Sequence, residues 1–540
     1  MPSRTRPALV LLSPPALCVL AVCLVNGTYT LIAAWSAATT GLTAVVPPSV
    51  ARRLGVAGLN LTVPLVFTYN ALLALGSLLL FLVPDFRRMT MESAELVRSR
   101  LGRAPVVAVC AAGSLLVAAV YLAIWSDAML PMYQERVRWF TDQIPDATPV
   151  DQAVLVRAHY LLRLLGDIRY TVPLLNAVFP AALLWFLAAY FGGRSAVWVN
   201  LAVLAVLCSY GAAYYSTGAD AEIPAAVFGM IGLLTVARGR VTLGLFWIWL
   251  ALLFKSTALY FLVSAVVLAL WPRRSRPAAW RELFSPLVGL MGVFLAFYYV
   301  NYVIYAATRG VTYLVHVRGD VFFWSPLREF ASEIATLYPV ILLLCVLALL
   351  FARGDRGVLL YATVSLIALR CTARVAGGYY TLFFVPLMMV LVAALFVRLA
   401  ERRAGSLVVA ALALVAFVSN AVGFVIHRDA VVSRRTMQWD AVIGGIDRAL
   451  PPGSEVLYRQ VSPKYDLERR GRGDLRFVYL PEDRVAALAR LEAPGAKAYI
   501  APGLDLSPET DRRLSDGGFR PLLGPVGPHG ARFRVFLKSV

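Results

Sequence analysis

Residues 241–270 read VTLGLFWIWLALLFKSTALYFLVSAVVLAL, and Lys255 is the only charged residue among them. The stretch is longer than the roughly 20 apolar residues that one helix needs to cross the hydrocarbon core of a bilayer. A charged side chain within hydrocarbon is costly, so we expect the chain to turn back at Lys255. The stretch therefore predicts a hairpin of two short helices, residues 241–254 and 256–271, inside a membrane.

The composition of the whole chain also indicates a membrane protein. Of the 540 residues, 60% are hydrophobic and only 15% are charged, and the mean hydropathy is +0.72. Soluble domains contain about half apolar and about a quarter charged residues. The composition therefore excludes a water-soluble globule, a disordered chain and a coiled coil.

Similar apolar runs recur through residues 1–427 and predict a multi-pass α-helical membrane domain with about 13 transmembrane helices. We expect them at 8–35, 61–84, 105–126, 171–191, 196–216, 223–237, 241–254, 256–271, 283–307, 337–352, 357–372, 379–397 and 405–426. Longer loops at 127–170 and 308–336 are expected on the outer face. Mixed apolar and charged residues at 130–141 and 152–165 predict helices on the membrane surface.

The basic residues predict the orientation of the chain. The net charge is +20, from 51 basic and 31 acidic residues. In a soluble protein this excess would indicate nucleic-acid binding, but arginines also gather in the cytoplasmic loops of membrane proteins. The loops expected inside contain Arg4, Arg6, Arg87, Arg88, Arg98, Arg100, Arg103, Arg194, Arg238, Arg240, Arg273, Arg274, Arg276, Arg281, Arg353, Arg356, Arg398, Arg402 and Arg403.

This arrangement puts the N-terminus in the cytoplasm and, after an odd number of spans, the C-terminus outside. The strong preference for Arg over Lys indicates a bacterial protein. We therefore expect the plasma (inner) membrane of a bacterium, with membrane lipids as neighbours and no nucleic acid as a partner.

Residues 428–540 are more polar and predict a separate soluble α/β domain outside the membrane. A helix is expected at 431–450, before Pro451-Pro452-Gly453. Alternating strands and helices follow, which is typical of an α/β domain. The expected strands are 455–459, 475–480, 496–501 and 532–538, and the expected helices are 481–492 and 507–515.

Acidic residues stand at predicted outer ends of spans. Asp127 directly follows one span, and Asp220 and Glu222 lie between two others. A carboxylate there can accept a proton from a hydroxyl or bind a divalent cation such as Mg or Mn, for which Asp127 and Asp220 are the candidates. The alternative is that all three are solvated acids of loops and helix caps. His159 lies in an outer loop, where it has either a functional role at the site or a purely structural role.

Cationic and aromatic residues lie on the same predicted face. The cations that suit a phosphate are Lys255 at the hairpin tip, Arg370 and Arg374. The aromatic residues that suit a sugar are Tyr379 and Tyr380, which follow Arg374. The alternatives are a lysine that reaches water along the membrane surface and tyrosines that mark the membrane interface.

The order of these features resembles the GT-C superfamily of membrane glycosyltransferases. Its bacterial branch includes the lipid A aminoarabinose transferase and the protein mannosyltransferase-like enzymes. The similar patches lie within residues 105–540. The predicted α/β domain outside the membrane, at the C-terminal end, also agrees with this superfamily. The patches are Ala123-Ile124-Trp125-Ser126-Asp127, Pro173 to Pro180 with Gly192-Gly193-Arg194, Asp220, Leu252-Leu253-Phe254-Lys255-Ser256-Thr257, Arg374, Tyr379, Tyr380 and Phe384-Val385-Pro386.

The resemblance implies transfer of a sugar from a polyprenyl-phosphate donor to an acceptor hydroxyl, with inversion, at the outer face of the membrane. The acceptor would be a glycan, a lipid or a protein. The implied roles are general base for Asp127, acceptor orientation or metal binding for Asp220, donor phosphate binding for Lys255, Arg370 and Arg374, and acceptor or sugar binding for Glu222, Tyr379, Tyr380 and His159.

Two other functions remain open from the sequence. A polymerase or ligase of lipid-linked oligosaccharides would use outer-loop Arg and His without needing Asp127. A transporter or flippase should show inverted repeats, broken helices and charges near the middle of the membrane. The chain has no evident repeat, and its ionisable residues gather at one predicted face.

Overall fold

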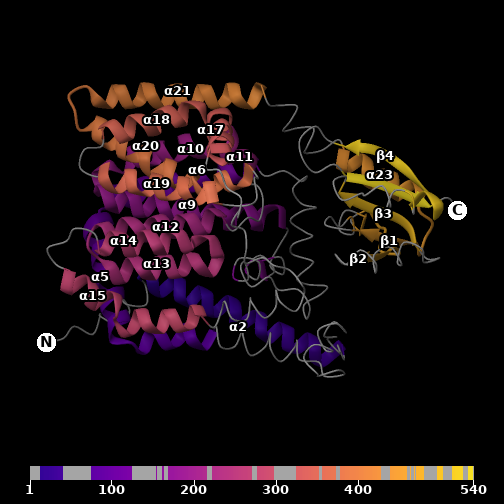
Figure 1. The fold of residues 1–540 in the computed structure, drawn as a ribbon, viewed down its shortest axis with the longest axis horizontal. Coiled ribbons are helices and arrows are strands. Elements are labelled where there is room, and N and C mark those ends of the chain that lie inside the picture. The colour runs from indigo at the N-terminus through magenta and orange to yellow at the C-terminus, as the bar shows by residue number, and fades with distance from the viewer. Residues whose placement is uncertain are drawn as a thin grey trace. The chain divides into compact units, whose positions relative to one another are not determined.

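The computed structural model divides into two compact units, a helical unit up to Asn420 and a second unit from Ala421 (Figure 1). The residues that it describes are 13–40, 74–124, 154, 158, 161–162, 168–215, 222–270, 276–296, 324–351, 356–372, 378–426, 438–458, 463, 467–468, 470–479, 496–502, 512, 514–526 and 533–538.

The helical unit consists of apolar helices that largely match the predicted spans. In chain order they are α2 (Pro14–Thr40), η1 (Leu80–Leu82), α5 (Pro84–Leu101), α6 (Ala104–Ile124), α9 (Ile168–Phe191), η4 (Gly193–Ser195), α10 (Ala196–Leu207), α11 (Tyr210–Tyr215), α12 (Glu222–Ala237), α13 (Val241–Phe254), η5 (Ser256–Ala258), α14 (Leu259–Leu270), α15 (Arg276–Leu283), Pro286–Ala296, α17 (Trp324–Leu337), α18 (Pro339–Phe351), α19 (Arg356–Thr372), η6 (Gly378–Phe383), α20 (Val385–Ala400) and α21 (Gly405–Ile426).

Within the described residues, four helices are long and apolar enough to cross a membrane: Ala104–Ala123, Tyr170–Phe191, Thr381–Ala400 and Gly405–Ile426. A bent pair, Phe330–Leu337 with Pro339–Phe351, would be a fifth, with a bend of 108°. Other apolar helical segments, such as Pro14–Thr28 of α2, have 10–17 residues. The protein is therefore an integral membrane protein, and the number of about 13 spans stays a prediction.

Helices α12, α13 and α14 pack against one another in the core of the helical unit (Figure 1). The turn between α12 and α13 has Gly239 at φ 85°, a conformation that glycine adopts without steric cost. The two helices approach closely at Gly232 and Gly244, where a Cβ added to either glycine would lie 2.7 Å from the carbonyl oxygen of the other. Small residues at this crossing therefore allow the tight packing.

The chain turns back at Lys255, as the sequence predicts. Helix α13 ends at Phe254, and Lys255 has an extended backbone with φ −156° and ψ 137°. At the other end of α13, the Thr242 amide and hydroxyl donate to Glu282 Oε2 over 3.1 and 3.4 Å. Glu282 belongs to α15, which follows α14. Helix α14 thus returns toward the start of α13, and the predicted hairpin is confirmed.

Some helices differ from the predicted pattern. The expected span 196–216 is two helices, because Ser209 interrupts it and its hydroxyl accepts a hydrogen bond from the Ala212 amide, as an N-cap does. Helix α17 occupies the end of the expected loop 308–336. Helix α5 was not predicted, because its many charged residues lower its hydropathy below that of a span. Its buried residues Phe86, Met89 and Ser93 are nevertheless at helical spacing and form one face.

The second unit contains a five-stranded mixed sheet in the order β2-β1-β3-β5-β4. Its elements are α23 (Gln438–Ala449), β1 (Glu455–Tyr458), β2 (Arg476–Tyr479), β3 (Ala496–Pro502), β4 (Phe519–Val526) and β5 (Phe533–Lys538). Strands β1, β2 and β3 pair in parallel, while β5 pairs antiparallel with β3 and β4. Ile443 and Ile446 of α23 pack on Val456 of β1 in its core.

The four predicted strands of this unit are confirmed, and β4 is an addition. Its sequence contains Pro521 and Pro525, which argue against a central strand. In the sheet β4 is at the edge, where proline is tolerated because one side of the strand needs no partner. The expected helix 481–492 lies outside the described residues, as do the surface helix 130–141 and most of 152–165.

Arg472 joins the end of α23 to the loop before β2. Its guanidinium donates to both carboxylate oxygens of Asp474 over 3.0 and 3.2 Å and to the carbonyl oxygens of Asp447 and Leu450 over 2.6 and 2.9 Å. The hydrogen bond from Arg472 holds the pKa of Asp474 below its ordinary value, and the hydrogen bond to Asp474 raises the pKa of Arg472.

Candidate functional site

Several helix ends meet at the end of the helical unit that lies away from α15 (Figure 1). Because α12, α13 and α14 alternate in direction, this end contains the start of α12, the tip at Lys255 and the start of α14. The short helix η6 contacts α12 and α11, and α11 contacts α6 and α17. The topology therefore gathers segments that are distant in sequence around the hairpin tip.

A buried ion pair connects two of these segments. The Lys255 ammonium donates a hydrogen bond to Glu222 Oε1. Glu222 is 0% exposed and Lys255 is 8% exposed. The helix dipoles favour both charges, because Glu222 opens α12 and Lys255 follows the last turn of α13. The two residues were predicted to bind different groups, and the structure brings them into direct contact.

Two polar atoms beside this pair lack a hydrogen-bond partner among the described residues. They are Glu222 Oε2 and Thr257 Oγ1, and both are buried. Buried polar atoms almost always have a partner in the protein, in water or in a ligand. Unsatisfied atoms in a buried charge pair and two residues from it in the chain are therefore what we expect where a polar ligand binds.

The η6 segment is anchored beside this tip. The hydroxyl groups of Tyr338 and Thr381 lie within hydrogen-bond distance, 3.4 Å apart, and Tyr338 stands at the bend between α17 and α18. Tyr379 and Tyr380 belong to η6, and Arg370 lies near the end of α19. The structure describes only the backbone of these three residues, so their predicted contacts stay predictions.

The other candidates, Asp127, Asp220, Arg374 and His159, lie outside the described residues. Their neighbours in the chain are described: α6 ends three residues before Asp127, and α12 begins two residues after Asp220. No group of three or more His, Cys, Asp and Glu that could hold a metal occurs in the part of the chain that the structure describes. Metal binding by Asp127 and Asp220 therefore stays a prediction.

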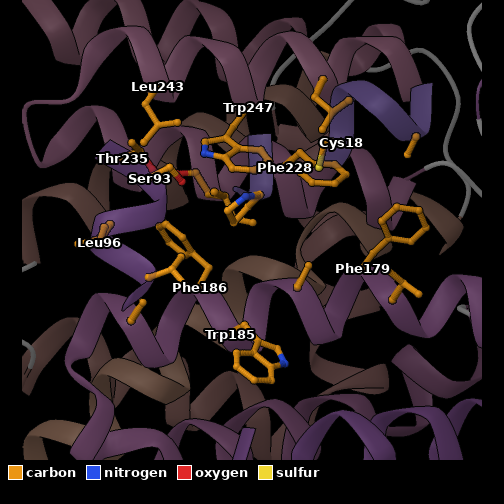
Figure 2. Close-up of a pocket in the computed structure, with 18 of the residues that line it drawn as sticks. Cys18, Ser93, Leu96, Phe179, Trp185, Phe186, Phe228, Thr235, Leu243 and Trp247 are labelled. Carbon is orange, nitrogen blue, oxygen red and sulfur yellow. The ribbon is translucent and has the colours of Figure 1, made fainter. Parts of the chain in front are cut away.

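The structure also contains a feature that the sequence did not predict, an apolar cavity of 740 Å³ (Figure 2). Residues of α2, α5, α9, α12 and α13 line it. None of these helices has a motif that signals a cavity, because the lining residues are ordinary apolar positions of each helix. Among the described residues, neither Glu222 nor Lys255 belongs to the lining.

The comparison with solved structures gives matches at low sequence identity. The match is to ArnT from Cupriavidus metallidurans, once bound to undecaprenyl phosphate (TM-score 0.47, 13% identity) and once in the apo state (TM-score 0.47, 14% identity). Each match covers 80% of this chain and 97% of the other. No family model and no curated protein matches the chain.

Proposed function

We propose that the protein is a membrane glycosyltransferase that moves a sugar from a polyprenyl-phosphate donor to an acceptor hydroxyl at the outer face of a bacterial plasma membrane. In this proposal residues 1–427 form the transmembrane domain and bind the donor. Residues 428–540 form an extracytoplasmic domain that binds the acceptor. The acceptor is a glycan, a lipid or a protein.

The observation that carries the proposal is the buried pair of Glu222 and Lys255 with unsatisfied polar atoms beside it. Buried charges in a membrane protein mark functional sites by default. The pair lies at a helical hairpin tip, where an apolar lipid tail could lie among the helices while its phosphate reaches the ammonium. A site for a lipid phosphate needs this combination of a cation and apolar surroundings.

Lys255 and Glu222 have complementary roles in this proposal. The Lys255 ammonium donates a hydrogen bond to Glu222. Glu222 fixes the direction of the lysine side chain, and the ammonium then binds the donor phosphate. We propose Arg370 and Arg374 as further phosphate ligands, since guanidinium groups bind phosphate with two parallel hydrogen bonds.

The transfer step follows from these roles. Asp127 accepts the proton of the acceptor hydroxyl, whose oxygen forms a bond to the anomeric carbon as the bond from that carbon to the phosphate oxygen breaks. Attack from the side opposite the phosphate inverts the configuration. The electron pair of the broken bond moves to the phosphate, where the cations stabilise the growing negative charge. Asp220 orients the acceptor, and Tyr379, Tyr380 and His159 contact the sugar or the acceptor.

The proposal is tested with membranes from cells that overproduce the wild type, Asp127→Asn or Asp220→Asn. A panel of radiolabelled polyprenyl-phosphate sugars is supplied, and transfer is measured at equal amounts of folded protein. We expect the wild type to consume one donor, Asp127→Asn to lose activity and Asp220→Asn to retain part of it. Undiminished transfer by Asp127→Asn would assign the base to another residue. Consumption of no donor would contradict the proposal and favour a polymerase, ligase or transporter.

A further inference from the structure

The apolar cavity runs along the helices and has two chemically different ends. Along α13 its lining extends from Leu243 to Phe254, about 16 Å at 1.5 Å per residue. Phe179, Phe228 and Phe254 lie at one end, with ring centroids 5.4 to 6.0 Å apart. In Figure 2, Leu243 and Thr235 lie on the side opposite to Phe179, with Trp247 between them.

The opposite end of the cavity is basic. Arg100 of α5 and Arg238 and Arg240 of the turn between α12 and α13 belong to the lining. The Arg238 guanidinium carbon lies 4.0 Å from the centroid of the Tyr190 ring and one of its nitrogens donates to the Tyr190 carbonyl oxygen over 3.4 Å. Arg240 Nη1 is buried and has no hydrogen-bond partner among the described residues.

These three arginines have no carboxylate partner within the described part of the chain. Three guanidinium groups at one end of an apolar cavity can therefore bind an anion. The cavity length of about 16 Å is close to one leaflet of the bilayer, which is half of the roughly 30 Å hydrocarbon core. Basic pockets between membrane helices bind anionic lipid headgroups.

We propose that the cavity binds an acyl chain of an anionic phospholipid from the leaflet on the arginine side, with the lipid phosphate at Arg100, Arg238 and Arg240. The chain lies along Leu243, Trp247 and Leu250 and ends at the phenylalanine cluster. Helix α5 supports this site, because its charged face and its buried apolar face suit a helix at a membrane surface. The arginines lie at the end of α13 opposite to Lys255, and the inference does not depend on the proposed sugar transfer.

The test is native mass spectrometry of the full-length protein, purified from bacterial membranes in mild detergent, with identification of bound lipids. We expect the wild type to retain an anionic phospholipid. Arg238→Gln with Arg240→Gln should lower the bound fraction at least about tenfold, since each arginine near a phosphate contributes about 1 kcal/mol. The control, Arg281→Gln with Arg403→Gln, removes two exposed arginines that do not line the cavity and should retain the lipid.

Equal retention by both double variants would overturn the proposal. Retention of only a zwitterionic phospholipid would also overturn it, as would displacement of the phospholipid by polyprenyl phosphate added in equal amount. If the double variant does not fold, the single variants Arg238→Gln and Arg240→Gln replace it, each with an expected loss of about fivefold.

Discussion

Glu222 and Lys255 lie 33 residues apart in the chain and form one buried ion pair. The sequence indicated both residues as candidates, because each is charged and stands at the end of an apolar run. Their contact was not predictable, since it depends on how α12 packs against α13. The site of Asp127 and Asp220 stays a prediction for a different reason, because both lie outside the described residues.

Removing one partner of this pair should destabilise the protein. In Glu222→Gln the buried Lys255 ammonium loses the negative charge of Glu222, and breaking a buried pair in this way costs about 3–5 kcal/mol of unfolding free energy. Thermal unfolding of the purified protein in detergent measures the loss. The double variant Glu222→Gln with Lys255→Met has no buried charge and should recover most of the stability. A Glu222→Gln protein that melts like the wild type would contradict this prediction.

The Asp474–Arg472 pair should make the C-terminal unit sensitive to acid. The pKa of Asp474 is lowered in the folded state, so its contribution to stability is present above the unfolded value of about 4 and is lost as the pH falls through the lower folded value. The hydrogen-exchange protection of β1 and β2 in the full chain should therefore decrease as the pH is lowered below about 4. Asp474→Asn should remove this loss of protection at low pH. If the wild type and the variant respond to acid identically, the prediction is wrong.

At the scale of elements, the predicted bounds of a helix match the structure where polar or charged residues flank its apolar run at both ends. Residues 241–254 and 405–426 are helices with the predicted bounds. The predictions were incomplete where tertiary packing decides, as in α5, whose charged residues suggested a loop, and in β4, whose prolines are accepted at a sheet edge.

The crossing of α12 and α13 should tolerate no side chain at its glycines. In Gly244→Ala the new Cβ would lie 2.4 Å from Val236 Cγ2 and 2.7 Å from the Gly232 oxygen, so the helices must separate. We expect a loss of about 1–3 kcal/mol, the usual cost of overpacking. The matched control is Gly289→Ala, whose Cβ meets no described atom within 4 Å. Unfolding by heat in detergent distinguishes the two, and equal stability would contradict the close approach.

At the scale of the whole molecule, the arginine-rich loops predict which side of the membrane each end faces. A reporter phosphatase fused after Val540 should be active, since it folds only outside the cytoplasm. A fluorescent reporter inserted between Arg402 and Arg403 should be bright, because that turn is expected inside. An inactive phosphatase with a dim inserted reporter would show the reverse orientation and would move the proposed site to the cytoplasmic face.

The central claim is that Lys255 binds the phosphate of a polyprenyl-phosphate sugar during transfer. The most direct measurement is donor consumption by the purified protein in lipid nanodiscs, comparing the wild type with Glu222→Gln/Lys255→Met. We expect the double variant to keep the fold without the cation, so that it separates function from stability. We predict that the wild type consumes the donor and that the folded double variant is slower by at least about a hundredfold, from the lost charge stabilisation of the transition state. Equal rates would contradict the account.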